Sequence, residues 1–453
     1  MKFCPECGAK IKNETYCPGC GIDLTRFLAP NEMPEGREMT PRERRERILA
    51  DFEVKDHAIV RYLGKGGRVI IPEGINAIRE NAFYRCGVVN EVILPASVRE
   101  IGDRAFYDCV GLDKITLSED LEAIGEQAFE GCAFAGKITF PEKLKVIGAG
   151  AFESCFALEE AHIPASVKSI GSAAFSSCKK LREIQVEKGS ETYSSADGVL
   201  FDKAGETLLC YPAGKEENIY RVPDKVKRIG ETAFYENENL ETIFIGRRAV
   251  SIQPTSLLMM KSLKRIKVSP FNPEYAEERG VLYRKDKTTL LCVPPAYKES
   301  VLDVPYAVTE IADNAAVSAA GLREVRLHGN VKKVGYNAFY GCTALTKIVV
   351  DEENPYFASE EGVLYNKAGT AILCYPAGRE KTYYEVPEGV KRIGKTAFAF
   401  ARNLTGVILP DGVESVGEYA FYRCDNLSYA YVPTKDLNAY RGVFPPACVV
   451  TDK

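Results

Sequence analysis

Four cysteines near the start of the chain have a spacing that could hold a metal ion. Cys4 and Cys7 form one C-x-x-C pair, Cys17 and Cys20 form a second, and nine residues separate the pairs. Two such turns bring four thiolates into the tetrahedral arrangement that zinc favours. A glycine follows each pair, which permits a tight turn and lets backbone amides approach the sulfur. The sequence therefore predicts a structural Zn²⁺ site, because four protein ligands leave no open position for catalysis.

The same four thiols are compatible with other chemistry. An iron–sulfur cluster, a rubredoxin-like iron centre and a redox-active dithiol use the same ligand type, and these alternatives stay open. The motif resembles a short zinc ribbon over residues 1–24, a module too small to fold without its metal. Such ribbons bind nucleic acid or protein. Here only Lys2, Lys10 and Lys12 supply positive charge, so nucleic acid is not the expected partner.

A second set of cysteines recurs at a fixed interval of 23 residues. Its members are Cys86, Cys109, Cys132, Cys155 and Cys178. Further along the chain the equivalent position is Asn237, Ala319 or Ala401, so the shared property is small size. A cysteine nucleophile needs a base, and none of the three histidines in the chain follows these positions. We therefore expect reduced thiols that fill a core.

These cysteines belong to a repeat that fills most of the chain. Residues 95–117 match P-x-x-V-x-x-I-G-x-x-A-F-x-x-C-x-x-L-x-x-I-x-L, and about eleven copies follow this pattern. The segment L-x-x-I-x-L predicts a short strand, and the spacing in A-F-x-x-C-x-x-L predicts one helical turn. One 23-residue unit cannot bury its apolar face alone, so the copies must stack. The predicted fold is an α/β repeat solenoid, a curved stack with a parallel β-sheet and short helical turns.

The repeats predict the order of the domains. Three islands carry a motif that begins G-V-L and ends L-C-x-P, with two apolar runs around a polar turn, which predicts β-hairpins. They span 187–222, 269–304 and 351–386. The expected order is a zinc ribbon at 1–24, a linker with a short helix at 25–50, a capping hairpin at 51–71, the repeats at 72–433 and a C-terminal cap at 434–453.

The repeat unit, I-G-x-x-A-F-x-x-C-x-x-L-x-x-I-x-L-P, resembles the BspA-type (Treponema-type) leucine-rich repeat over about residues 52–433. The resemblance implies a right-handed curved solenoid whose concave parallel sheet binds proteins. Many members of that family are surface adhesins with secretion signals. This chain begins with cysteine pairs and shows no apolar signal segment at its start. We therefore expect a cytoplasmic, non-catalytic interaction protein, and an adhesin exported without a recognisable signal stays an alternative.

Composition and motifs argue against several other functional classes. The formal net charge of −4 does not favour bulk nucleic-acid or membrane binding, and no apolar run is long enough to span a membrane. A nucleic-acid adaptor that uses the ribbon and the arginines at 42–47 is kept as a second alternative. Residues 389–396, GVKRIGKT, match a phosphate-binding loop, but they coincide with repeat positions, which favours chance overlap.

The outward positions of the predicted strands carry the functional prediction. The residue between the Ile and the Leu of each strand should face away from the core, because side chains alternate along a strand. Exposed apolar residues gather in the C-terminal half, and such patches mark partner sites. We expect a protein or peptide partner there. The predicted contact residues are His162, Gln185, Phe244, Lys267, Arg326, Val349, Ile408 and Tyr431.

Overall fold

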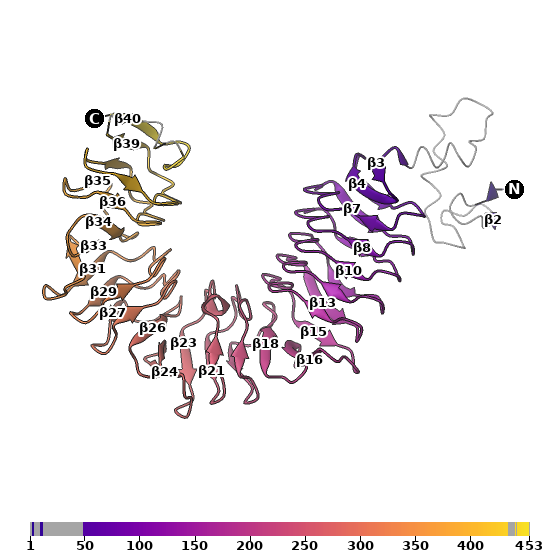
Figure 1. Ribbon diagram of the computed structural model, residues 1–453, viewed down its shortest axis with the longest axis horizontal. Helices are drawn as coiled ribbons and strands as arrows, with labels where there is room; N and C mark the ends of the chain where they lie inside the picture. Colours follow the sequence, from indigo (N-terminus) through magenta and orange to yellow (C-terminus); the bar gives the residue numbers. More distant parts are fainter. Residues whose placement is uncertain (1, 4–9, 12–48, 434–439, 441, 453) are drawn as a thin grey trace.

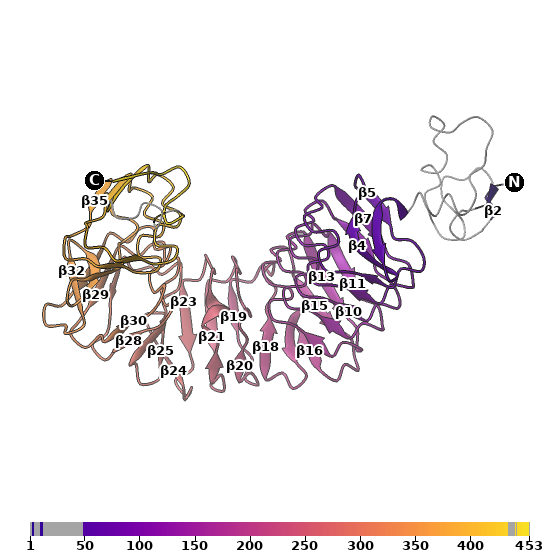
Figure 2. The ribbon, with the colours of Figure 1, turned by 45° about the horizontal axis from the view of Figure 1, so that its top comes forward.

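The computed structural model describes residues 2–3, 10–11, 49–433, 440 and 442–452 of the chain. In this part the chain winds into a long, open arc of short strands, with an N-terminal and a C-terminal limb on either side of a middle section (Figure 1). Figure 2 shows the strands β18 to β23 side by side between the two limbs. The one complete helix in the described residues is the 3-10 helix η2 (Pro254–Leu257).

One set of strands, the row strands, forms parallel sheets of three or four members. The sheets are β5-β7-β9, β11-β13-β15, β19-β21-β23, β27-β29-β31 and β35-β37-β39-β40. Their bounds are β5 (Gly67–Ile70), β7 (Val89–Ile93), β9 (Lys114–Thr116), β11 (Gly136–Thr139), β13 (Leu158–Ile163), β15 (Glu183–Val186), β19 (Ile219–Arg221), β21 (Thr242–Ile245), β23 (Arg265–Val268), β27 (Val301–Asp303), β29 (Glu324–Leu327), β31 (Lys347–Val350), β35 (Tyr383–Glu385), β37 (Gly406–Ile408), β39 (Tyr429–Val432) and β40 (Val449–Asp452).

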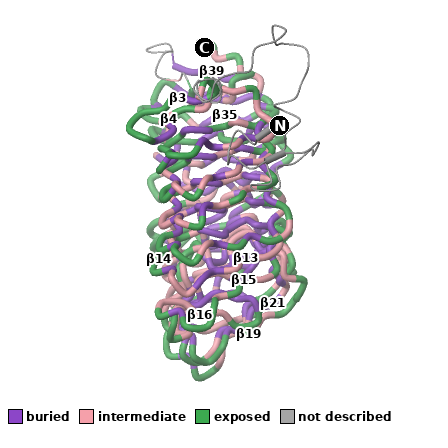
Figure 3. The backbone as a smooth tube through the Cα atoms, turned by 90° about the vertical axis from the view of Figure 1, so that its right-hand side faces the viewer, coloured by how far each residue is buried: buried purple, intermediate pink, exposed green. Residues whose placement is uncertain are grey.

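A second set of two-residue strands runs along the other side of the rod. They are β6 (Ala77–Ile78), β8 (Glu100–Ile101), β10 (Ala123–Ile124), β12 (Val146–Ile147), β14 (Ser169–Ile170), β20 (Arg228–Ile229), β22 (Ser251–Ile252), β28 (Glu310–Ile311), β30 (Lys333–Val334), β36 (Arg392–Ile393) and β38 (Ser415–Val416). The antiparallel pair β3 (Phe52–Lys55) and β4 (Ala58–Tyr62) forms the N-terminal end of the sheet that contains β6, β8, β10, β12 and β14. Figure 3 shows β13, β15 and β21 on one side and β14 and β16 on the other.

The prediction of helical turns was wrong. The segment after each short strand forms a string of hydrogen-bonded turns, in which Arg104 and Asp108 have left-handed φ angles of 52° and 54°. The amide of Phe106 donates to the carbonyl of Ala128, in the following copy, at 2.7 Å. A right-handed helix needs φ near −60° and bonds within its own segment, so these turns cannot continue as a helix. The segment thus links neighbouring copies as a third hydrogen-bonded side.

The interior holds columns of stacked phenylalanines. The ring centroids of Phe83 and Phe106 are 4.6 Å apart, and those of Phe106 and Phe129 are 5.1 Å apart. The same column recurs at the other end, where Phe398 lies 4.8 Å from Phe421. Such pairs add about 0.5–1.5 kcal/mol each beyond the burial of their surface. The columns explain why one copy specifies the position of the next.

Each island adds three antiparallel strands. They are β16 (Tyr193–Ala196), β17 (Val199–Asp202) and β18 (Thr207–Cys210), then β24 (Tyr275–Glu278), β25 (Val281–Arg284) and β26 (Thr289–Cys292), then β32 (Phe357–Glu360), β33 (Val363–Asn366) and β34 (Ala371–Cys374). The first hairpin of each island lies on the free edge of a row sheet. The amide of Ile184 in β15 donates to the carbonyl of Gly198 at 2.9 Å, and Gly280 and Gly362 accept equivalent bonds.

The islands divide the core into four blocks. One core cluster runs from Phe52 to Leu200, and the next begins at Val199. At the other two boundaries, neighbouring residues again belong to different clusters: Val281 and Leu282 at one, Val363 and Leu364 at the other. Adjacent side chains of one island strand therefore point into different blocks, so each island is a joint. In the described part of the chain, no helix is long and apolar enough to cross a membrane.

Candidate functional site

The structure places all eight predicted contact residues on row strands, in register with one another. Neighbouring strands pair them two by two, as His162 with Gln185, Phe244 with Lys267, Arg326 with Val349 and Ile408 with Tyr431. They do not form one continuous stripe, because an island hairpin occupies the edge of β15, β23 and β31. The candidate face is therefore a series of separate panels, one on each row sheet.

On the panel formed by β19, β21 and β23, the outward side chains already make contacts within the chain. The guanidinium of Arg221 lies 3.8 Å above the ring of Phe244, in the register-paired position of the preceding strand. The ammonium of Lys267 pairs with Glu277 of the adjoining island at 2.7 Å. Phe244 and Lys267 are both half-buried. A partner would have to displace these contacts, so this panel is a weaker candidate than its sequence suggests.

The panel on β27, β29 and β31 is an ion-pair network. Glu324 accepts from Arg326 at 2.7 Å and pairs with Lys347 of the next strand at 2.8 Å. These hydrogen bonds, from Lys347 and then Arg326, hold the pKa of the Glu324 carboxyl below its ordinary value. Val349 is 40% exposed beside them. In the first block, His162 Nε2 lies 3.6 Å from a carboxylate oxygen of Glu160, and Gln185 is exposed.

The C-terminal panel differs, because aromatic residues dominate it. Tyr383 of β35, Tyr429 and Tyr431 of β39 and Val449 of β40 are 45%, 56%, 38% and 53% exposed. Ile408 of β37 is half-buried between them. We call these five residues the C-terminal aromatic face. Tyr383 and Tyr429 were missed by the sequence analysis, which took one outward residue per strand, although alternation marks the residue two places earlier as outward too.

Four of the five cysteines at the 23-residue spacing, Cys109, Cys132, Cys155 and Cys178, are buried core residues and also hydrogen-bond donors. The thiol of Cys109 donates to the carbonyl of Phe83 at 3.0 Å, and Cys132 and Cys155 make the same contact one copy further on. Burial raises the pKa of the Cys109 thiol to about 12. A protonated, enclosed thiol is a poor nucleophile. All eleven cysteines in the described residues are free.

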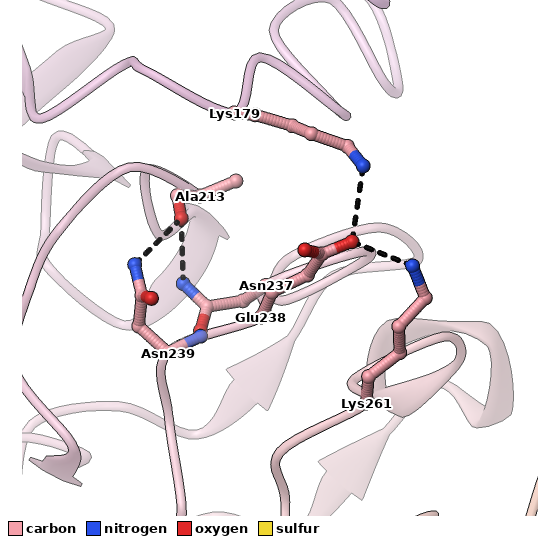
Figure 4. Close-up of polar contacts among 6 residues, drawn as sticks. All are labelled: Lys179, Ala213, Asn237, Glu238, Asn239 and Lys261. Atoms are coloured by element: carbon pink, nitrogen blue, oxygen red, sulfur yellow. Dashed lines mark hydrogen bonds and ion pairs between the residues drawn. The ribbon is translucent and has the colours of Figure 1, made fainter.

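Asn237 keeps a hydrogen-bond donor at the cysteine position of the repeat, whereas Ala319 and Ala401 have none there. The side-chain amide of Asn237 donates to the carbonyl of Ala213 at 3.4 Å, a contact drawn in Figure 4. Asparagine and cysteine share a donor at this point, which was the signal that the sequence analysis left unused. Beside it, Glu238 joins Lys179 at 3.0 Å and Lys261 at 2.7 Å, across the first island (Figure 4). These contacts hold the joint together.

The phosphate-loop match has no free amides at its centre. The amide of Gly394 donates to Ile372, that of Thr396 to Glu418 and that of Lys391 to Thr370. A phosphate-binding loop needs such amides to point at the ligand. The segment therefore works as an ordinary part of the repeat.

The predicted metal ligands Cys4, Cys7, Cys17 and Cys20 lie outside the described residues. Around the first pair, the backbone of β1 (Lys2–Phe3) runs antiparallel to β2 (Lys10–Ile11), so the first C-x-x-C occurs in the segment that joins two paired strands. Among the residues whose placement is described, no group of three or more His, Cys, Asp or Glu side chains could hold a metal ion.

Comparison with known families agrees with this architecture. The family model described as "BspA type Leucine rich repeat region (6 copies)" matches residues 65–192, 216–278, 298–361 and 377–445. The chain belongs to the BspA-type leucine-rich repeat family. The gaps between the matched segments, at 193–215, 279–297 and 362–376, fall in the middle of the three islands, which fits the islands as additions to the BspA-type repeat. No curated protein matches the chain.

Several solved structures of leucine-rich repeat proteins are similar to the chain. A leucine-rich repeat protein from Eubacterium ventriosum is 21% identical over 87% of this chain and 86% of its own, with a TM-score of 0.49. A leucine rich cell surface protein from Faecalibacterium prausnitzii is 22% identical over 87% and 95%, with a TM-score of 0.43. The Leucine Rich Repeat protein of T. pallidum is 28% identical over 47% and 88%, with a TM-score of 0.30.

Proposed function

We propose that this protein is a non-catalytic scaffold that binds a protein or peptide partner through the C-terminal aromatic face. The observation that carries the proposal is the gathering of exposed Tyr383, Tyr429, Tyr431 and Val449 on one four-stranded sheet. Exposed tyrosines on a rigid sheet supply contact area at low entropic cost, and tyrosine is enriched among residues that dominate binding energy. On the panels of β19-β21-β23 and β27-β29-β31, Lys267, Arg326 and Lys347 are engaged in ion pairs within the chain, and these panels would serve as spacers.

We further propose that Cys4, Cys7, Cys17 and Cys20 hold a zinc ion in an N-terminal ribbon. The donor set of four thiolates fits Zn²⁺, and the antiparallel pairing of β1 with β2 suits a turn that presents the first two sulfurs. The ion would be structural. We also propose a cytoplasmic location, where the eleven free thiols of the described residues would stay reduced.

The test compares capture of protein partners by the full chain and by three variants. The variant Tyr429→Ala/Tyr431→Ala removes two rings of the aromatic face. Tyr306→Ala, at a 71% exposed tyrosine outside the rows, is the matched control. Cys4→Ser/Cys7→Ser removes half of the proposed zinc ligands, and the metal content of each preparation is measured by mass spectrometry.

We expect the double tyrosine variant to lose its partners at least tenfold, while Tyr306→Ala keeps them. One zinc per full-length chain, lost in the cysteine variant with partners retained, would support an accessory ribbon. Partners or co-purifying nucleic acid that disappear only with the cysteines would instead assign recognition to the ribbon. Recovery of the native chain on the cell surface would favour the adhesin alternative.

A further inference from the structure

We infer that the C-terminal aromatic face binds an extended, proline-containing peptide in the polyproline II conformation, with a basic residue beside the prolines. This inference rests on the proposed function and names the chemistry of the partner. Three features of the panel carry it: the spacing of its tyrosines, the glycine between them and the charge of its outward side.

The spacing of the tyrosines matches the period of a polyproline II helix. Tyr383, Gly406 and Tyr429 are register partners on three consecutive strands. Neighbouring strands lie about 4.8 Å apart, so the backbone positions that carry the two tyrosines lie roughly 9.6 Å apart across the sheet. A polyproline II helix rises about 3.1 Å per residue with three residues per turn, so equivalent side chains recur every ~9.3 Å. A peptide that crosses the strands would therefore meet one tyrosine per turn.

Gly406 has no side chain, so the ring of Tyr383 can lie over it. A Cβ atom added at Gly406 would come within 2.9 Å of Cδ2 of Tyr383, so the ring of Tyr383 lies over the glycine. Tyr431, in the adjacent row, pairs in register with Ile408 and adds a second apolar contact. The result is a shelf of ring and aliphatic surface. Proline rings pack on such aromatic surfaces, and polyproline carbonyls stay free to accept from tyrosine hydroxyls.

The charge of the panel selects for a basic peptide. Glu385 is the only acidic or basic side chain in the two outward rows that the described strands β35, β37, β39 and β40 form. Two described cations that precede these strands in the sequence are already paired, since Lys381 binds Glu361 and Arg402 lies 3.4 Å from Asp425. A lysine or arginine of the peptide would thus find a carboxylate on the shelf and no competing cation in these rows.

The inference is tested by fluorescence anisotropy of the full chain with labelled peptides. The probe contains four Pro-Pro-Lys triplets. A peptide of four Gly-Gly-Lys triplets keeps the charge and loses the polyproline conformation, and one of four Pro-Pro-Glu triplets keeps the conformation and inverts the charge. The protein variants are Tyr429→Ala, Glu385→Gln and the control Tyr306→Ala.

We expect the Pro-Pro-Lys probe to bind at least tenfold more tightly than either control peptide. Tyr429→Ala should weaken it tenfold or more, Glu385→Gln should weaken it about threefold and reduce the preference over Pro-Pro-Glu, and Tyr306→Ala should leave it unchanged. Equal binding of Gly-Gly-Lys, no binding at 1 mM, or an unaffected Tyr429→Ala would overturn the inference.

Two further outcomes separate this inference from the proposed function. If the peptide does not bind but capture of a folded protein partner still depends on Tyr429 and Tyr431, the peptide chemistry is wrong and the scaffold proposal stands. If sedimentation shows concentration-dependent association of the chain that Tyr429→Ala abolishes, the face is an interface with a second copy, and the peptide is not its ligand.

Discussion

The panel on β27-β29-β31 and the panel on β35-β37-β39-β40 share a core but differ on their outward side. In the first, Leu302, Val325 and Ile348 point inward and are buried, as Tyr384, Val407 and Ala430 do in the second. Outward, the first carries charged residues that pair with one another, and the second carries tyrosines. Because side chains alternate along a strand, packing in the core and chemistry at the surface fall to different residues. The outward side can therefore change its chemistry while the stack that supports it stays the same.

The largest expected effect tests the shared core. Leu345 and Leu404 occupy the same buried position in the third and fourth blocks. Leu345→Ala and Leu404→Ala should each lower the free energy of unfolding by about 2–5 kcal/mol, because each leaves a cavity in a packed stack. Urea unfolding followed by circular dichroism measures the loss. If one variant lost less than about 1 kcal/mol, the two cores would not be equivalent.

A smaller effect tests the thiol donor, which each of the two blocks has in one copy of the repeat and lacks in the other. The thiol of Cys342 donates to the carbonyl of Ala316 at 2.9 Å and that of Cys424 to Phe398 at 3.0 Å, whereas Ala319 and Ala401 hold this position in the preceding copies. Cys342→Ala should lower the free energy of unfolding by about 1 kcal/mol, since it removes a buried hydrogen bond and some packing. Cys342→Asn tests the donor itself, and a loss equal to that of alanine would show that only size matters.

The smallest expected effect tests the ion pairs that distinguish the panel on β27, β29 and β31. Glu324→Gln should cost no more than about 1 kcal/mol at low salt and less at high salt, because the pairs lie at the surface. The pKa of Glu324 is lowered in the folded chain, so its contribution is present above pH 4.5 and is lost as the pH falls through the folded value. Thermal melts at pH 7 and at low pH measure this difference. A salt-independent, pH-independent loss would contradict the assignment.

The sequence predicts the stack because each copy repeats its buried positions, and Phe106 or Leu112 can be aligned by eye. The prediction of helical turns was wrong because the left-handed angles recur at fixed repeat positions that are often held by residues such as Arg104, whose type does not favour that conformation; aspartate, as at Asp108, tolerates it but does not require it. The contact of Arg221 with Phe244 was missed for another reason. It depends on the register of two strands 23 residues apart, beside an island whose attachment to a sheet edge has no local signature.

The islands also have a consequence for how such a chain can change length. Gly280 lies 82 residues after Gly198, and Gly362 lies 82 residues after Gly280. Each glycine has a positive φ angle and caps the edge strand of one block. Loss of residues 199–280 would join Gly198 to Val281, a glycine–valine step like the one it replaces. A gene for this protein can therefore gain or lose whole blocks by recombination, and the length measured along the arc changes in fixed increments.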